Sequence, residues 1–379
     1  MDIKQQHISE SFARIKVVGI GGGGCNTVNR MIEAGIPGIE FIAINTDNQS
    51  LMNSKAKIKV SLGHQITRGL GTGGDPEKGR LAAEESAEDL YAVLKGSDMV
   101  FIVAGMGGGT GTGASPIAAK IAQELEALTI AVVTSPFTFE GVKRIQTAEI
   151  GIDNLRKNVN TLIVIPNDRL RQLSDKHTSF IDAFNLGDDP LKQAIECISE
   201  LITSPGLVNR DFADVRTIMT MGGAAYFAVG RASGEDRAKV AAEMAITNKL
   251  LNVTLEGARG VLLNISGGSS LTIDEVSQAA AVIRDTAHPD VNLLFGATVD
   301  PNIGDEIRIT VIATGFDQAR MRSRFGRIID QVGDENKNVD ESLRVSGIDY
   351  ASGNYNPSDM EIPTFLRKYK ISSGESDKS

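Results

Sequence analysis

The sequence predicts an α/β fold in which a doubly wound parallel sheet is followed by a long helix and a second α/β domain. Three observations support this prediction. Short apolar runs alternate with helical patterns from about residue 14 to residue 165, which is typical of a parallel sheet covered by helices. Apolar residues then recur at helical spacing from Phe180 to Thr203. A second set of apolar runs follows from residue 216.

Each expected strand of the first block is followed by a turn and a helical pattern. One helix is expected over about 28–34, and another from near Pro76 to about Leu94. Pro116 is expected in a first helical turn, where its missing N–H costs no hydrogen bond. A further helix begins at about Lys143. The expected strands are Ile15–Ile20, Phe41–Asn45, Met99–Ala104, Leu128–Thr134 and Leu162–Ile165.

The long helix over 180–203 separates the two blocks. Leu191, Ile195, Ile198 and Ile202 form one apolar stripe along it, and Pro205 ends it. No cluster of His, Cys or paired acids stands out in the second block, so we expect a supporting domain. Its expected strands are Thr217–Met219, Phe227–Ala232, Val261–Ile265, Leu293–Val299 and Ile307–Thr314, and its expected helices are Asp236–Asn248 and Ile273–Thr286.

These patterns divide the chain into seven parts. Polar composition at both ends predicts flexible segments, and apolar character returns near residue 361. The predicted parts are a flexible segment 1–13, a nucleotide-binding domain 14–179, a central helix 180–205, a C-terminal domain 206–316, a flexible linker 317–358, a partner-binding peptide 359–370 and a tail 371–379.

Composition excludes several classes of protein. A chain of 379 residues with 41% hydrophobic residues can bury the cores of two domains. A net charge of −9 and a pI of about 5.2 argue against general nucleic-acid binding. Two cysteines, Cys25 and Cys197, give no disulfide framework and fit a reducing cytosol. Neither a signal peptide nor a run of about 18 apolar residues is found, so we expect a cytoplasmic protein without direct membrane insertion.

The segment from Gly105 to Gly113 is the strongest chemical signal in the chain. Its six glycines lie between an apolar strand and a helix, where backbone N–H groups and the helix N-terminus can close on an anion. Two more glycine loops, at 19–26 and 69–76, also follow strands or open helices, so the three can converge on one pocket. No P-loop lysine is present, so a phosphate site would depend on backbone amides and a metal.

A nicotinamide-dependent dehydrogenase is a competing interpretation. Residues 19–24 contain a Gly-x-Gly-x-x-Gly pattern, and Asp47 lies at the end of the next strand, as in dinucleotide-binding domains. That class needs only one glycine loop and predicts a catalytic His or Lys, whereas the four histidines form no recognisable constellation. A binding module that holds nucleotide without hydrolysing it is a third alternative.

An acidic segment follows the central helix. It contains Asn209, Asp211 and Asp214 within six residues. From spacing alone, a helix end followed by a solvated turn explains these residues better than catalysis does.

The chain resembles the FtsZ family of bacterial tubulin-like division GTPases over about residues 14–316 and again at 361–368. The motifs that carry the resemblance are Gly22-Gly23-Gly24-Cys25-Asn26, Asn45-Thr46-Asp47, the tubulin signature loop Gly107–Gly113, Pro136-Phe137 through Glu140 and Arg144, Pro166-Asn167-Asp168, and Asn209 through Asp214. The resemblance implies a tubulin/FtsZ-like fold and a cell-division GTPase. Another tubulin-like cytoskeletal GTPase is the nearest alternative.

The resemblance also implies a set of site residues. Phe184 would stack on guanine and Asp189 would accept from its N–H edge, while Asp47 would help to hold Mg²⁺, through water. Asn209, Asp211 and Asp214 would position and activate the attacking water. GTP would be bound by Gly22, Gly23, Gly24, Cys25, Asn26, Asn45, Gly73, Gly74, Gly107, Gly108, Gly109, Thr110, Gly111, Glu140, Arg144, Asn167, Phe184 and Asp189.

Assembly and partners are implied in the same way. The acidic loop would enter the nucleotide site of the next subunit in a head-to-tail filament, so GTP hydrolysis to GDP would require assembly. K⁺ is a further candidate cofactor. Ile362, Pro363, Phe365, Leu366 and Arg367 would bind membrane-anchor and regulatory proteins and place the filament at the division site, with Glu361 in place of the family's Asp. Cys25 stands where a smaller residue is expected, which predicts sensitivity to thiol reagents.

Overall fold

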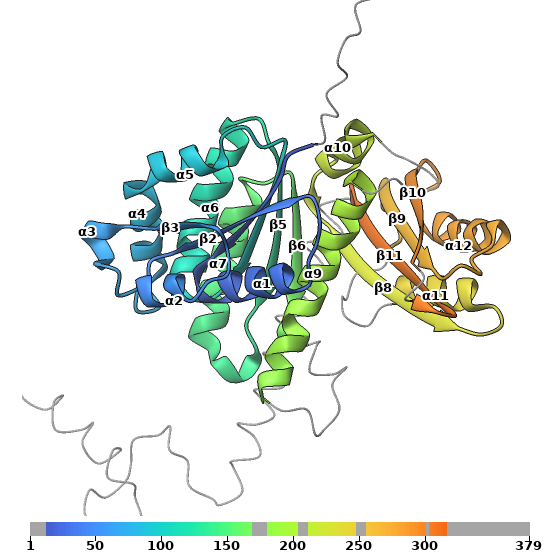
Figure 1. The fold of residues 1–379 in the computed structure, drawn as a ribbon, viewed down its shortest axis with the longest axis horizontal. Coiled ribbons are helices and arrows are strands. Elements are labelled where there is room, and N and C mark those ends of the chain that lie inside the picture. The colour runs from blue at the N-terminus through green and yellow to red at the C-terminus, as the bar shows by residue number, and fades with distance from the viewer. Residues whose placement is uncertain (1–12, 169–179, 204–210, 248–254, 301–302, 317–379) are drawn as a thin grey trace, which may run out of the picture. The chain divides into compact units, whose positions relative to one another are not determined.

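The first block is a seven-stranded, wholly parallel sheet (Figure 1). The computed structural model describes residues 13–168, 180–203, 211–247, 255–300 and 303–316. The strand order is β3-β2-β1-β4-β5-β6-β7, which reverses direction between β1 and β4. Ligands of doubly wound sheets bind at such a reversal, outside the carboxyl ends of the strands. The strands are β1 (Ile15–Ile20), β2 (Ile39–Asn45), β3 (Ile58–Ser61), β4 (Met99–Gly105), β5 (Leu128–Ser135), β6 (Thr161–Pro166) and β7 (Gly223–Ala224).

Helices cover both faces of this sheet. The apolar strands β4 and β5 are buried almost throughout, as expected for strands covered on both sides. One core includes Val28 of the first helix and Ile195 of the long helix, and the opposite core includes Ala118 and Leu90. The helices are α1 (Gly21–Glu33), α2 (Asn48–Met52), α3 (His64–Thr67), α4 (Pro76–Glu85), α5 (Ala87–Leu94), α6 (Gly109–Glu124), the 3₁₀ turn η1 (Thr138–Glu140), α7 (Val142–Arg156) and α9 (Phe180–Thr203).

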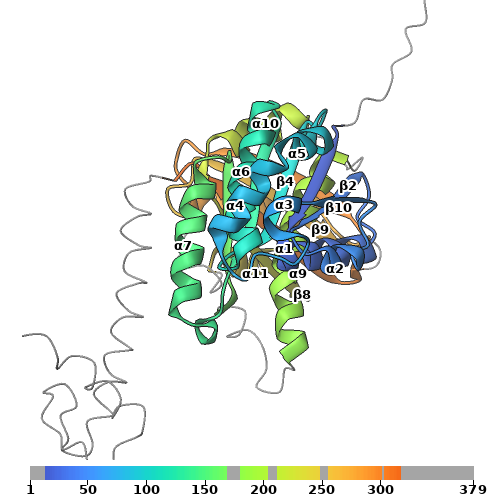
Figure 2. The same ribbon diagram turned by 90° about the vertical axis from the view of Figure 1, so that its left-hand side faces the viewer.

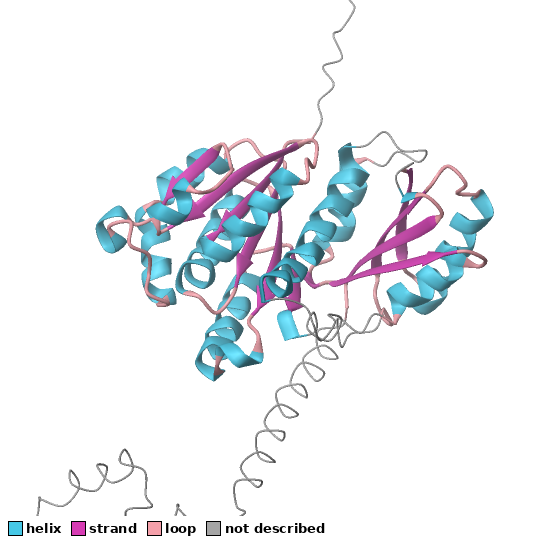
Figure 3. Cartoon of the chain, turned by 60° about the horizontal axis from the view of Figure 1, so that its bottom comes forward, coloured by secondary structure: helices cyan, strands magenta, loops and turns pink. Residues whose placement is uncertain are grey.

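The second block is a four-stranded sheet in the order β10-β9-β11-β8. Strand β11 runs antiparallel to both neighbours, and β10 runs parallel to β9. Figure 3 shows the strands of the two sheets as separate groups, each with helices against it. Leu262 and Ile312 of one face share a core with α9, while the opposite face packs on α11 and α12. The elements are α10 (Phe212–Thr220), β8 (Tyr226–Ser233), α11 (Arg237–Ile246), β9 (Gly260–Gly267), α12 (Ile273–Thr286), β10 (Asn292–Val299) and β11 (Glu306–Thr314).

Several expected elements need correction. Helices α1 and α6 begin inside the glycine segments, so Pro116 lies within α6 and not in its first turn. The helix expected over 76–94 is two helices that meet at Ser86, whose φ of −100° and ψ of 25° depart from helical values. The Ser86 hydroxyl accepts the Gly63 N–H (3.0 Å). The segment Thr217–Met219 is helical, within α10, since a short apolar run does not distinguish strand from helix. Strands β3 and β7 were not expected from the sequence.

The flexible segments predicted at both ends, and the peptide at 359–370, lie outside the described residues. Within the described ranges, no helix is both long and apolar enough to cross a membrane.

Candidate functional site

A cavity of about 360 Å³ opens at the carboxyl ends of β1, β4, β5 and β6. It lies where the strand order reverses, as expected for a ligand site in a doubly wound sheet. Two arginines and one acid line it, and that acid, Glu140, is paired with Arg144, so the cavity suits an anion. Its lining residues are Ile20, Gly21, Gly22, Gly23, Asn26, Thr27, Arg30, Thr72, Gly105, Met106, Gly108, Gly109, Thr110, Gly111, Thr134, Pro136, Phe137, Glu140, Arg144, Asn167 and Leu191.

The first glycine segment is the first turn of α1. Gly22 faces open space, so its backbone can approach a ligand closely. Gly24 differs, because a Cβ there would overlap the carbonyl oxygen of Val103. Gly24 therefore allows α1 to pack on β4 and does not line the cavity.

The side chain of Cys25 points into the core. Its Sγ lies 3.5 Å from the Gly19 carbonyl oxygen and 3.6 Å from that of Ile44. Burial raises the pKa of this thiol to about 12 and outweighs the opposing effect of the hydrogen bond to the Ile44 carbonyl oxygen. A buried neutral thiol reacts poorly, so the expected sensitivity to thiol reagents is wrong for the folded protein. Only the backbone of Cys25 could contribute to a ligand site.

The signature segment forms the first turns of α6. The first amides of a helix have no partner inside the helix, so those of Gly109, Thr110 and Gly111 can bind an anion. Gly108 is the residue before the helix and faces open space. A Cβ on Gly109 would overlap Thr72 Oγ1. The signature glycines therefore serve both the cavity and the packing of α6.

Gly107 and Gly113 have packing roles. Gly107 has a φ of 94°, which other residues rarely adopt, and its N–H donates to Thr112 Oγ1 (2.8 Å). A Cβ on Gly113 would overlap the carbonyl oxygen of Pro76 in α4. Gly107 instead lies against Arg144 of α7. Figure 2 shows α4 beside α6, the two helices between which Gly113 lies.

The turn after β2 contains Asn45, Thr46 and Asp47. Asn45 is buried, and its Oδ1 accepts from the N–H of Thr46 (2.9 Å) and of Asp47 (3.4 Å). Asp47 Oδ1 accepts from the N–H of Gln49 (3.0 Å) and of Ser50 (3.4 Å), which caps α2. Neither Asn45 nor Asp47 is among the residues that line the cavity. Asn45 therefore shapes this turn, and Asp47 keeps one carboxylate oxygen without a hydrogen bond among the described residues.

The donors near the cavity fit Mg²⁺ only if phosphates supply most of its ligands. Nowhere in the described ranges do three or more His, Cys, Asp or Glu side chains come together as a metal site. Mg²⁺ is commonly held by one or two carboxylates together with phosphates and water. A single carboxylate from Asp47 fits that pattern.

The third glycine loop lies next to α4. Gly73 and Gly74 have φ values of 62° and 83° and face open space, but the cavity is lined by their neighbour Thr72. The loop is tied to the turn after β2, because the Gly71 N–H donates to the Thr46 carbonyl oxygen (3.1 Å).

The far end of the cavity is formed by η1, α7 and the turn after β6. Glu140 Oε1 accepts from the Phe137 N–H (2.8 Å), and its Oε2 lies 3.0 Å from Arg144 Nη1. Asn167 Oδ1 is buried and has no hydrogen-bond partner among the described residues. An unpaired buried acceptor is costly, so a ligand that donates a hydrogen bond there would be favoured.

Phe184 and Asp189 were expected to contact the guanine base, and only Asp189 has a described side chain. Asp189 is exposed and does not line the cavity, whereas Leu191, two residues later in α9, does. The side chain of Phe184 lies outside the described residues.

Asp211 and Asp214 lie near the amino ends of the strands, at the opposite end from the cavity. Asp211 precedes α10 and Asp214 is in its first turn, and both are exposed. Helix α10 packs at the amino ends of the strands, because Arg216 donates to the Glu126 carbonyl oxygen before β5 (3.1 Å). Thr161, the first residue of β6, likewise donates to the Met219 carbonyl oxygen. Figure 1 shows α10 above β5 and β6. Asn209 lies outside the described residues.

Sequence reasoning missed several lining residues, among them Thr27, Arg30, Thr72 and Thr134. Two of them carried a readable signal. Arg30 lies four residues after Asn26 and so on the same helix face, and Thr72 stands between two glycines of the third loop.

Comparison with known families gives two matches. The GTPase domain of the tubulin/FtsZ family matches residues 14–175, and the C-terminal domain of the FtsZ family matches residues 223–317. The match to a GTPase domain decides against the dehydrogenase alternative.

Solved structures agree with the family matches. The empty FtsZ dimer of M. jannaschii is 42% identical, with a TM-score of 0.77, and the match covers 81% of this chain and 89% of that one. CetZ2 of Haloferax volcanii, a GTPγS-bound protofilament, is 18% identical, with a TM-score of 0.70, covering 85% and 99%. CetZ1 of the same organism, a GDP-bound monomer, is 19% identical, with a TM-score of 0.68, covering 80% and 95%. The CetZ matches show a shared fold.

Proposed function

Because the chain belongs to the FtsZ family of tubulin-like GTPases, we propose that it polymerises head to tail and hydrolyses GTP at the junction between subunits. In this proposal the filaments form the cell-division ring, in the cytoplasm beneath the membrane. The peptide at 361–368 links them to membrane-anchor and regulatory proteins. The similar FtsZ of M. jannaschii is a dimer in its empty structure, which is consistent with self-association.

One observation carries the proposal: the cavity lies at the carboxyl ends of the parallel strands, whereas α10, with Asp211 and Asp214 at its start, lies at their amino ends. Strand β4 has seven residues, so the two ends are about 20 Å apart. Asp211 and Asp214 therefore cannot reach the cavity of their own subunit. A second copy stacked along the strand direction would bring them to it, and such a heterologous contact repeats into a filament.

Within that junction each group has a chemical task. The amides at the start of α6, with Gly22 and Gly23, would hold the phosphates. Glu140 and Asn167 would bind the ribose and base. Asp211 and Asp214, together with Asn209, would orient and activate water, a task that suits carboxylates better than phosphate binding does. Mg²⁺, held by phosphates and Asp47, would offset phosphate charge, and K⁺ is a further candidate cofactor.

The test is phosphate release from GTP as a function of protein concentration, in buffer containing Mg²⁺ and K⁺. We expect a threshold below which turnover vanishes and a linear rise above it. A rate per molecule that stays constant down to low concentration would show that each monomer is catalytically complete, and the assignment of Asp211 and Asp214 would be wrong.

A mixing experiment assigns the acids to the neighbouring subunit. Asp214→Asn should bind GTP like wild type but lose turnover, and adding it to wild-type protein should inactivate wild-type sites in proportion to its share of the filament. Asp89→Asn is a matched control, because Asp89 is the exposed third residue of α5 as Asp214 is of α10. If adding Asp214→Asn lowers the GTP turnover of wild-type protein no more than adding Asp89→Asn does, Asp211 and Asp214 act within their own subunit or have no catalytic role.

A further inference from the structure

Thr46 is a buried hydroxyl residue behind the start of α6. It follows β2, and none of its side-chain surface is exposed. Its Oγ1 lies 2.6 Å from Oγ1 of Thr110, which is in the first turn of α6 and lines the cavity. Thr46 is therefore the side chain that contacts the Thr110 hydroxyl from the protein side.

The direction of this hydrogen bond follows from the buried position of Thr46. In a hydrogen bond between two hydroxyls 2.6 Å apart, one hydroxyl donates its proton and the other accepts it. The proton of the accepting hydroxyl must then find a different acceptor or remain without a hydrogen bond. Among the described residues, Thr46 Oγ1 has no hydrogen-bond partner other than Thr110. If Thr110 were the donor, the proton of Thr46 would be buried without an acceptor, which is costly. Thr46 therefore donates, and the proton of Thr110 remains available to the cavity.

The backbone of Thr46 is fixed on both sides. Its N–H donates to Asn45 Oδ1 (2.9 Å), and its carbonyl oxygen accepts from the Gly71 N–H (3.1 Å). These contacts hold the hydroxyl against Thr110, so the direction of the hydrogen bond does not depend on a mobile side chain.

We propose that Thr46 is a positioning residue for nucleotide binding: it donates to Thr110 Oγ1 and so presents the Thr110 hydroxyl to the cavity as a donor to a phosphate oxygen. The inference rests on the proposed GTP site. Thr46 itself is not among the residues that line the cavity. Because Thr46 donates to Thr110, the Thr110 hydroxyl does not donate to Thr46, and its proton points to the cavity.

The test is a double-mutant cycle on nucleotide affinity, measured by competition of GTP and GMP with a fluorescent GDP at protein concentrations below assembly. Thr110→Val removes the donor and should weaken GTP binding roughly 10- to 100-fold, the range for a hydrogen bond to a charged group. Thr46→Val should weaken it about 3- to 10-fold, a fraction of that effect. In the Thr110→Val background, Thr46→Val should have no further effect. GMP, which lacks the outer phosphates, should be affected less than GTP in each variant.

Two controls separate positioning from packing. Thr46→Ser keeps the hydroxyl and should bind like wild type. Thr129→Val removes an equally buried hydroxyl, which donates to the Ala127 carbonyl oxygen at the other edge of the sheet, and should leave affinity unchanged. If Thr46→Val folds poorly, Thr46→Cys keeps the volume with a weaker donor and should give a smaller loss in the same direction.

The possible outcomes distinguish the inference from the proposed function. Wild-type affinity in Thr46→Val, or an equal loss for Thr46→Val with and without the Thr110 hydroxyl, would overturn the inference and leave the GTP site intact. Equal losses for GTP and GMP would also overturn it. If the wild-type protein binds GMP as tightly as GTP, or binds neither, the proposed function itself fails.

Discussion

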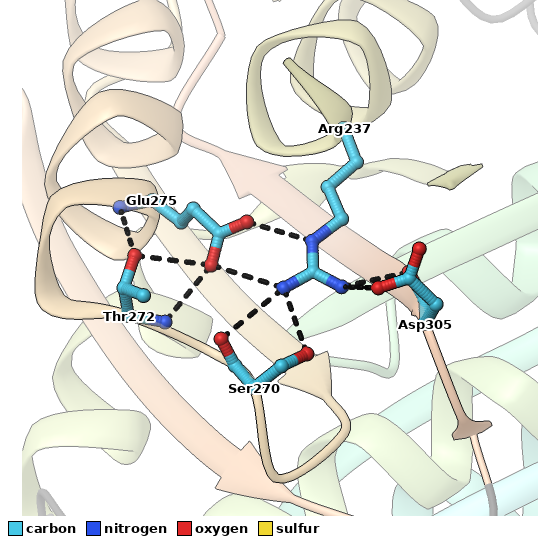
Figure 4. A network of polar contacts seen from close by, with 5 residues as sticks. All are labelled: Arg237, Ser270, Thr272, Glu275 and Asp305. Atoms are coloured by element: carbon cyan, nitrogen blue, oxygen red, sulfur yellow. Dashed lines mark hydrogen bonds and ion pairs between the residues drawn. The ribbon is translucent and has the colours of Figure 1, made fainter. Parts of the chain in front are cut away.

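Replacing Glu275 by Gln should destabilise the second block by about 2 kcal/mol at neutral pH. Glu275 belongs to a polar network around the buried Arg237 (Figure 4). Arg237 Nε donates to Glu275 Oε1 (2.6 Å), and Nη1 donates to Asp305 Oδ1 (2.6 Å). Glu275 Oε2 also accepts from the Thr272 N–H (2.9 Å), which caps α12. The network joins α11, α12 and the turn before β11.

The magnitude follows from the Glu275 pKa. The hydrogen bond from Arg237, and then those from Thr272, outweigh desolvation and lower this pKa from 4.5 to about 2. A shift of this size corresponds to about 3 kcal/mol at neutral pH. Since 22% of the Glu275 side chain is exposed, and Gln can still cap Thr272, we expect about 2 kcal/mol.

The pH dependence has a definite sign. A carboxyl whose pKa is lowered by folding stabilises the protein above its unfolded pKa, and this stabilisation is lost as pH falls toward the folded pKa. The difference between wild type and Glu275→Gln should therefore be constant down to about pH 5 and shrink between about pH 5 and pH 2. About two-fifths of it should be gone by pH 3.5.

The assay is urea unfolding between pH 7 and pH 3.5, followed by hydrogen exchange of peptides from β9 and β11 and, for comparison, from β1 and β4. Glu243→Gln is the control, because Glu243 is exposed on the outer side of α11. A destabilisation that does not change with pH, or one that Glu243→Gln reproduces, would refute the electrostatic reasoning.

Three further predictions concern single side chains. Burial raises the pKa of Glu200, whose Oε2 accepts from Asn264 Nδ2 (3.1 Å), so the ionised carboxylate destabilises the folded protein at any pH above the ordinary pKa of the group. Glu200→Gln should therefore raise the melting temperature at pH 7 but not at pH 4, and an equal rise at both pH values would contradict this. Gly113→Ala should cost roughly 2–4 kcal/mol of unfolding free energy because its Cβ would overlap the Pro76 carbonyl oxygen, whereas Gly108→Ala, which meets open space, should fold normally; chemical denaturation compares the two. Asn167→Leu removes an unpaired buried acceptor, so the nucleotide-free protein should melt no lower than wild type while GTP affinity falls about tenfold, and calorimetry with and without GTP would show whether both hold.

Much of the fold could be predicted because its strands are buried on both faces. A short, wholly apolar run such as Val100–Ala104 is typical of a strand that is buried on both faces of a parallel sheet, and the segments next to it in sequence form the helices that cover it. Helix α12 was predicted with its observed bounds, and in the structure Thr272 and Glu275 form a capping box at its start. The strand prediction for Thr217–Met219 failed because a segment of three residues, two of them apolar, shows no periodicity. Its helical state depends on packing against the strands of both sheets.

The site was only partly predictable, for a different reason. The sequence shows which segments are rich in glycine but not which glycines face a ligand. Gly22 and Gly108 face open space, whereas Gly24 and Gly113 meet a backbone carbonyl oxygen from another element. That distinction arises from tertiary contacts, which no local pattern records. The same holds for Cys25, whose position in a glycine motif suggested a reactive thiol until its burial was known.

The glycines that pack α6 on α4 also connect these two helices closely. Because α4 and α6 touch through backbone atoms at Gly109 and Gly113, they cannot move apart or together independently. The third loop leads into α4, the signature segment forms the start of α6, and Thr46 contacts both segments, through Gly71 and through Thr110. The start of α6 and the loop at 69–74 are therefore joined by direct contacts, and we expect a ligand that shifts one of them to shift the other. That loop carries Leu70, whose side chain is 84% exposed, so a shift of the loop would move a large apolar side chain on the surface.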